Sequence, residues 1–129
     1  MSDKNLKHAV GVDFGGTFIK MALVNERGTI EARARIPTGE AASQTAWIDA
    51  VETGARQLVA KKSLKLGDLA GVGVGVPGFV DFERGFVYDL ANVPGWKSVS
   101  LGPRLEERFG VHIRVDNDVN AMAMGECTF

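Results

Sequence analysis

Two apolar runs and one strict alternation of apolar and polar residues predict three strands near the start of the chain. Residues 8–14 are mainly apolar and end at a pair of glycines, and residues 18–24 are apolar on both faces except for Lys20. Residues 29–36 alternate strictly, with one apolar and one polar face: Ile30, Ala32, Ala34 and Ile36 against Thr29, Glu31, Arg33 and Arg35. The tight turns between these segments predict an antiparallel meander whose third strand lies toward an edge of the sheet.

Helices and strands then alternate along the rest of the chain. Ser43 can N-cap a helix that runs to about Lys62, because apolar residues recur there at helical spacing. We further expect a strand over 71–76, a hairpin over 79–90, a short helix over 103–110, a strand over 111–115 and a helix over 119–127. The predicted fold class is α/β: a mixed five-stranded sheet that contains the antiparallel three-strand meander, with flanking helices.

Composition narrows the class of protein. The 129 residues carry 15 Lys and Arg against 16 Asp and Glu, and this balance argues against a dedicated nucleic-acid-binding protein. The single cysteine, Cys127, excludes an intrachain disulfide and a zinc site built on cysteines. No apolar run approaches the roughly 20 residues that a membrane span needs, and no signal peptide is visible. We therefore expect a cytoplasmic protein without nucleic-acid or membrane partners.

The first candidate site is the turn at residues 13–17, between the first two predicted strands. Gly15 and Gly16 let the backbone approach a phosphate closely, and Thr17 adds a hydroxyl donor. Asp13 could hold Mg²⁺, usually through water, because Mg²⁺ gives up its hydration shell reluctantly. The alternative is a plain hairpin turn that needs a positive φ, with Asp13 as the turn cap.

The second candidate is the polar run Asp116, Asn117 and Asp118, which joins the last predicted strand to the last helix. Asp118 is placed to accept a proton from a substrate hydroxyl, and Asn117 could hydrogen-bond that substrate. One of the three side chains would serve as an ordinary N-cap, and the other two exceed what capping requires. Two further stretches, residues 76–81 and 92–96, carry turn residues and could each be a simple loop.

In combination, these segments resemble the N-terminal half of a ROK-family sugar kinase, which implies an actin/hexokinase-like (ribonuclease H-like) lobe. Residues 11–17, GVDFGGT, resemble the family's first phosphate motif, and residues 76–85 resemble its P-G-x-V-D…G segment. Residues 92–96, NVPGW, resemble N-[LV]-P-G-W, and residues 115–126, VDNDVNAMAMGE, resemble [DE]-N-D-A-N-A-A-A-x-G-E. The motifs occur in the family's order and cover nearly the whole chain.

The resemblance implies transfer of a phosphoryl group from ATP to a hexose hydroxyl, with glucose as the first guess. Asp118 would be the catalytic general base that accepts the proton of that hydroxyl. Asn117 and Asn92 would hydrogen-bond other sugar hydroxyls, and Gly78 would line the same pocket through its backbone. These roles assign the hexose substrate to the second half of the chain.

The donor would bind at the first motif. By the same resemblance, Gly15, Gly16 and Thr17 would cradle the donor phosphates, with Mg²⁺ near Asp13. Lys20 is a charge in an otherwise apolar strand, so it either extends to water or meets a carboxylate or phosphate at the strand edge. A lysine at this place resembles the polyphosphate-using glucokinases, which leaves polyphosphate open as the donor.

In the family, a second and larger domain carries the second phosphate motif, the adenosine pocket and often a cysteine-rich zinc site. The present chain ends at Phe129. We therefore expect residues 1–129 to be the N-terminal lobe alone, the C-terminal domain to be missing, and the isolated chain to be inactive. The resemblance also implies that the parent protein is a homo-oligomer.

Two other functions stay open. One is the sugar-sensing domain of a ROK transcriptional repressor, although few residues precede Asp13 and such repressors often lack the aspartate found here as Asp118. The other is a structural or interaction fragment without catalytic activity, whose uncovered edge would promote self-association.

Overall fold

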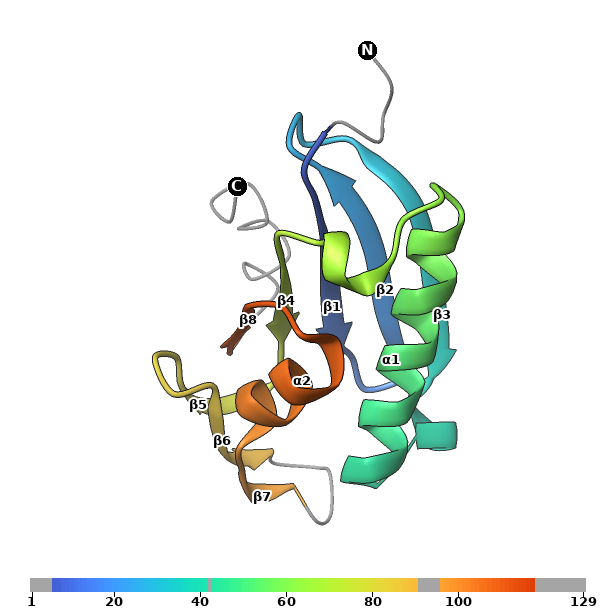
Figure 1. Cartoon of the computed structure of the whole chain (residues 1–129). Coiled ribbons are helices and arrows are strands. Elements are labelled where there is room, and N and C mark those ends of the chain that lie inside the picture. Colours follow the sequence, from blue (N-terminus) through green and yellow to red (C-terminus); the bar gives the residue numbers. More distant parts are fainter. Residues whose placement is uncertain (1–5, 42, 91–95, 118–129) are drawn as a thin grey trace.

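A five-stranded sheet organises the chain in the computed structural model, which describes residues 6–41, 43–90 and 96–117 (Figure 1). The predicted meander is confirmed: β1 (His8–Phe14), β2 (Phe18–Asn25) and β3 (Ile30–Pro37) pair antiparallel. Two later strands, β4 (Gly71–Gly75) and β8 (Ile113–Asp116), add to β1 in parallel. The order β3-β2-β1-β4-β8 makes the sheet mixed, as predicted, and leaves β3 and β8 at its edges.

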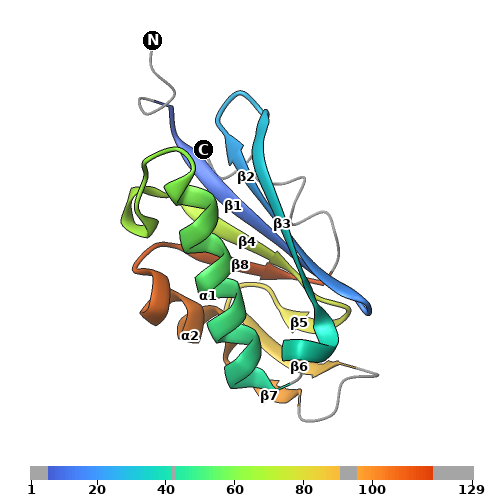
Figure 2. The same ribbon diagram turned by 90° about the vertical axis from the view of Figure 1, so that its right-hand side faces the viewer.

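Two helices cover one face of this sheet (Figure 2). The first, α1 (Gln44–Ala60), begins at the predicted cap, where Ser43 Oγ accepts a hydrogen bond from Ala46 N at 3.0 Å. The second, α2 (Leu101–Phe109), ends at Gly110, which adopts the left-handed conformation with φ of 70°. Between the helices and the sheet lies one apolar core, to which every strand of the five contributes.

A second, three-stranded sheet lies at the end of the first sheet where β1 and β4 finish (Figure 1). It contains the expected hairpin of β5 (Gly78–Asp81) and β6 (Phe86–Leu90), and a third strand, β7 (Lys97–Val99). The sequence pattern does not predict β7, because three residues are too few to show an alternation. The 3₁₀ helices η2 (Thr38–Ala41) and η3 (Leu66–Asp68) are also unpredicted, and the expected helix over 119–127 lies outside the described residues.

A register shift in the β2–β3 ladder corrects one prediction about β3. Leu23 pairs with Ala32 whereas Val24 pairs with Ile30, so Glu31 is the extra residue of a bulge. Beyond a bulge the side chains change faces. Glu31 therefore turns toward the helices, where its side chain is only 5% exposed, and Ile30 turns outward and is 44% exposed. The prediction that Ile30 shares the buried face and Glu31 the polar face is wrong for this reason.

The two faces of the five-stranded sheet differ in chemistry. Valines and other large apolar residues of β1, β2, β4 and β8 face the helices. The opposite face carries small residues in its centre, among them Gly11, Ala22 and Gly73, and charged residues at one end. No helix within the described ranges covers that face, and none of the described helices is long and apolar enough to span a membrane. The charged end of this face positions the candidate site.

Candidate functional site at the carboxyl edge of the sheet

The β1–β2 turn is held by its own backbone and by η2. Gly15 N donates to Asp13 O at 3.1 Å and to Phe18 O at 3.0 Å. Thr38 holds the turn from the other side, because its Oγ1 donates to Gly15 O at 2.8 Å and its N donates to Thr17 O at 2.9 Å. Sequence reasoning missed this positioning role of Thr38, and only its place directly after β3 hinted at it. The turn is thus fixed in shape before any ligand binds.

Gly15 and Gly16 serve different purposes in this turn. A Cβ on Gly15 would lie 2.6 Å from Phe18 O, so the fold itself requires glycine there. A Cβ on Gly16 would meet nothing within 4 Å, and neither residue is among the described glycines with positive φ. The alternative of a turn that needs positive φ is therefore wrong. Within the described residues, the N–H groups of Gly16 and Thr17 have no backbone acceptor, so both can donate to an anion.

Two carboxylates lie in one row across the parallel strands at this edge. Asp13 at the end of β1 pairs with Gly75 of β4, and Gly75 pairs with Asp116 at the end of β8. Residues that pair directly face the same side of a sheet, and two strand spacings amount to about 10 Å. Gly75 has no side chain, so no side chain of β4 separates the two carboxylates.

The motif segments that begin at residues 76 and 115 meet at the ends of β4 and β8. Val76 N donates to Asp116 O at 2.9 Å, and Gly78 N then donates to Val76 O at 3.2 Å. Asn117 is exposed directly beyond Asp116, whose Oδ1 accepts from Asn117 N at 2.7 Å. The structure therefore brings Gly78 and Asn117 to the same edge as Asp13 and the turn. Asn92 and Asp118 lie outside the described residues.

An aromatic cluster of three rings packs beneath this edge. Phe14, the last residue of β1, stacks on Trp47 of α1 with ring centroids 5.1 Å apart and meets Trp96 edge-on at 5.1 Å. Trp96, the last residue of the NVPGW segment, is fully buried. The cluster fixes the end of β1 against α1 and against the segment that leads into β7.

The oxygen donors of the edge suit a hard divalent cation. Asp13 and Asp116 are half-buried carboxylates, and neither forms an ion pair with another described residue. Mg²⁺ keeps several waters and is bound through one or two carboxylates together with substrate phosphates. The residues present therefore fit Mg²⁺ at Asp13.

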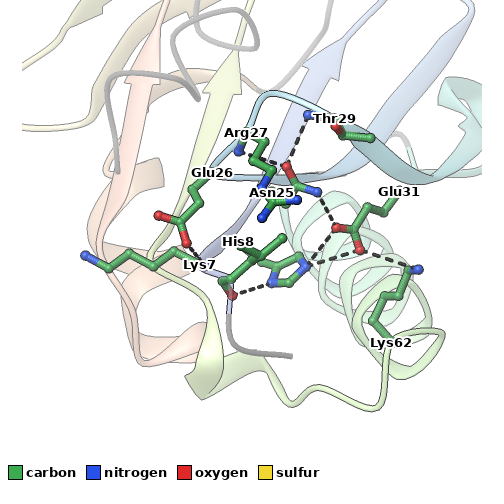
Figure 3. A network of polar contacts seen from close by, with 9 residues as sticks. Lys7, His8, Asn25, Glu26, Arg27, Thr29, Glu31 and Lys62 are labelled. Carbon is green, nitrogen blue, oxygen red and sulfur yellow. Dashed lines mark hydrogen bonds and ion pairs between the residues drawn. The ribbon is translucent and has the colours of Figure 1, made fainter. Parts of the chain in front are cut away.

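The opposite end of the sheet carries a buried polar network (Figure 3). Glu31 accepts from Asn25 Nδ2 at 2.6 Å and lies 3.6 Å from Lys62 Nζ and 3.1 Å from His8 Nε2. Burial raises the pKa of the Glu31 carboxyl, but the hydrogen bonds from Asn25 and His8, and the charges of His8 and Lys62, outweigh burial and lower it. Every member already has a partner inside the fold, so this network is structural.

Comparison with known proteins places these observations in a family. The sequence profile described as "ROK family" matches residues 9–129. The chain is 40% identical over 121 residues to a glucokinase of Halalkalibacterium halodurans, which covers 91% of this chain and 35% of that protein. It is 35% identical over 116 residues to an N-acetyl-D-glucosamine kinase of Salmonella arizonae, and this match covers 90% of the present chain and 36% of that protein. The chain thus spans about a third of the length of these curated relatives.

Solved structures show the same fold. A ROK family glucokinase from Streptomyces griseus, in complex with glucose and AMPPNP, superposes with a TM-score of 0.75 and 30% identity over 95% of this chain and 36% of its own. An inorganic polyphosphate/ATP-glucomannokinase from Arthrobacter sp. strain KM superposes with a TM-score of 0.66 and 28% sequence identity. The match covers 95% of this chain and 48% of that protein. A ROK family transcriptional regulator superposes with a TM-score of 0.69 at 21% sequence identity, over 95% of this chain and 30% of its own. At this identity the similarity shows the fold alone. The predicted actin/hexokinase-like lobe is confirmed.

Proposed function

Because this chain belongs to the ROK family, we propose that it is the N-terminal lobe of a sugar kinase that transfers a phosphoryl group from ATP to a hexose hydroxyl. The observation that carries this proposal is the convergence of three motif segments, at residues 13–17, 76–78 and 116–117, on one edge of the sheet. Phosphoryl transfer needs positioned phosphates, a positioned acceptor and charge neutralisation at one place. Glucose is the first candidate sugar, since the 40%-identical relative is named a glucokinase.

In the proposed mechanism the second half of the site handles the sugar. The Asp118 carboxylate accepts the proton of the acceptor hydroxyl as the sugar oxygen forms its bond to the transferred phosphorus. Asn117 and Asn92 hold neighbouring hydroxyls through their amides, and Gly78 contributes backbone. This assignment is supported by the exposure of Asn117 and by the hydrogen bond that joins the ends of β4 and β8.

The first half of the site handles the donor. The free N–H groups of Gly16 and Thr17 bind phosphate oxygens, and Gly15 and Thr38 keep the turn in the required shape. Asp13 would hold Mg²⁺ through water, and Mg²⁺ when bound neutralises charge on the transferring group. The AMPPNP complex of the Streptomyces griseus structure supports ATP as donor, and the name of the Arthrobacter structure supports polyphosphate as an alternative.

The remaining parts of the nucleotide and sugar sites would belong to a second domain of a longer protein. The curated relatives support this division, because the chain matches 35% to 36% of their length. A repressor function is less well supported: the regulator is 21% identical, whereas a glucokinase and an N-acetyl-D-glucosamine kinase are 40% and 35% identical. We propose that the 129-residue chain binds sugar weakly and turns over nothing by itself.

The first experiment is a calorimetric titration of the chain with glucose, N-acetylglucosamine and N-acetylmannosamine, beside a coupled phosphorylation assay. We expect saturable binding of one sugar, no turnover, and loss of binding in Asn117→Ala with the circular dichroism spectrum unchanged. In a longer chain that contains the second domain, Asp118→Asn should lower kcat by about three orders of magnitude and leave KM nearly unchanged. Full turnover in that variant would remove Asp118 from the role of base.

A further inference from the structure

Phe14 joins the phosphate turn to the aromatic cluster beneath it. It lies between Asp13, the proposed Mg²⁺ ligand, and Gly15, the first glycine of the turn, and its side chain is buried. Its ring stacks on the ring of Trp47 at an interplanar angle of 27°, with the two centroids 5.1 Å apart. Close stacking restricts the position and the tilt of the Phe14 ring, and with them the backbone on either side of it.

Trp47 is itself held at the start of α1. Its backbone N–H donates to Ser43 O at 2.8 Å, and Ser43 also caps the helix through its side chain. The indole is completely buried, and it meets the ring of Trp96 edge-on with the centroids 5.5 Å apart. The capped helix end and the close packing hold the indole in place. Trp47 therefore presents a fixed surface to the ring of Phe14.

An indole at this position is unfavourable for packing alone. The buried Nε1–H groups of Trp47 and of Trp96 have no hydrogen-bond acceptor among the residues that the structure describes. Buried indole N–H groups usually find an acceptor, because removing a donor from water without a partner costs stability. A leucine or a phenylalanine would fill the core without this cost. Stability alone therefore does not account for the two tryptophans, whereas a requirement for wide, flat rings beneath Phe14 does.

A second support reaches the same turn from the segment that precedes α1. Thr38 donates from Oγ1 to Gly15 O at 2.8 Å and from its backbone N to Thr17 O at 2.9 Å. Residues 38–47 therefore hold the turn at two places, directly through Thr38 and indirectly through Trp47. The N–H groups that are proposed to bind phosphate lie between these attachments along the chain. Their orientation thus depends on both supports.

We propose that Trp47 is a positioning residue for the phosphoryl donor. Trp47 lies outside all the motif segments and touches neither substrate, and it acts through Phe14 on the free N–H groups of the turn. The inference rests on the proposed function and adds one residue to its donor site. Donors that are fixed in advance need no reorganisation when phosphate binds, and a misplacement of about 1 Å can cost on the order of a hundredfold in rate. A smaller side chain at Trp47 would leave space into which Phe14 and the turn relax, so the donor would bind more weakly.

Calorimetry of the 129-residue chain with tripolyphosphate, at one Mg²⁺ concentration, tests the inference. Every variant is measured at a temperature at which circular dichroism shows it to be folded. We expect Trp47→Leu to weaken tripolyphosphate binding about tenfold, and Trp47→Phe, which keeps a flat ring, to restore most of this loss and remain about threefold weaker than the wild type. Leu58→Ala is the matched control, because Leu58 is buried near the other end of the same helix. It should lose stability and leave the Kd unchanged, since an unfolded fraction lowers only the number of binding sites.

Wild-type affinity in folded Trp47→Leu would overturn the inference, and so would an equal loss of affinity in Leu58→Ala. If Trp47→Leu does not fold, Trp47→Phe decides in its place, and wild-type affinity in that variant is the contradicting result. Either outcome would leave the donor turn and the proposed function standing, because the wild type still binds tripolyphosphate. A wild-type chain that binds no tripolyphosphate would overturn the donor half of the proposed function, and the role of Trp47 with it.

Discussion

The carboxylate of Glu31 lies 3.1 Å from Nε2 of His8, and both side chains are almost completely buried (Figure 3). The contact joins β1 to the bulge of β3, and Lys62, just after α1, approaches the same carboxylate. His8 Nδ1 in turn lies 2.9 Å from Leu6 O, so both ring nitrogens face oxygen atoms. Ion pairs around Glu31 therefore stabilise the end of the sheet where β1 begins. Aromatic packing around Phe14 stabilises the opposite end, which carries the candidate site.

Removing the charge from this network should destabilise the fold. Glu31→Gln keeps the size of the side chain but leaves buried His8 without its carboxylate, so we expect the free energy of unfolding to fall by roughly 2–4 kcal/mol. Urea denaturation followed by circular dichroism measures the change. Glu107→Gln is the control, because Glu107 is exposed on α2, and it should stay within about 0.5 kcal/mol. Equal stability of the two variants would show that the network contributes nothing.

The same carboxyl should make the fold sensitive to acid. Its pKa is lowered in the folded chain from the ordinary value of 4.5, because hydrogen bonds and nearby charges outweigh the opposing effect of burial. The contribution to stability is therefore complete above the ordinary pKa and is lost as the pH falls through the folded-state pKa. The unfolding free energy of the wild type should decrease more steeply below pH 4.5 than that of Glu31→Gln. Urea midpoints across this range give the difference, and parallel curves would contradict it.

The contact between Gly85 and Gly102 should tolerate no side chain. A Cβ on Gly102 would lie 3.0 Å from Gly85 Cα, and the backbone there is joined by a hydrogen bond of 2.9 Å from Gly102 N to Gly85 O. Gly102→Ala should push the β5–β6 turn away from α2 and cost about 1–3 kcal/mol in urea denaturation. Gly67→Ala makes the matched comparison, since a Cβ there meets nothing within 4 Å and should change stability little.

The two glycines of the phosphate turn should separate stability from binding. Gly15→Ala places a Cβ 2.6 Å from Phe18 O, so it should lower the thermal unfolding temperature. Gly16→Ala meets nothing within 4 Å and should leave that temperature unchanged, while its Cβ obstructs a phosphate at the free N–H groups and weakens tripolyphosphate binding about tenfold. Unchanged phosphate affinity in a folded Gly16→Ala variant would count against the turn as the donor site.

Local signals in the sequence predicted most of the elements of the fold. The Ser43 cap and the first three strands are indicated by neighbours within a few residues, and the structure agrees with these predictions except for the faces of Ile30 and Glu31. The elements that were missed, β7 and the two 3₁₀ helices, are too short to show a period. The motif segments of the candidate site could be located from the sequence for the same reason, because each is a continuous run of residues.

Sequence patterns therefore establish the set of elements, the α/β class and the position of each motif along the chain. Which side chains meet depends on the tertiary structure. The row of Asp13, Gly75 and Asp116, the pairing of Lys20 with Arg35, and the inward turn of Glu31 all follow from strand register. Strand register is set jointly by strands that are far apart in the sequence, and a single bulge reverses the faces of the residues beyond it. Register therefore cannot be predicted from a local sequence pattern.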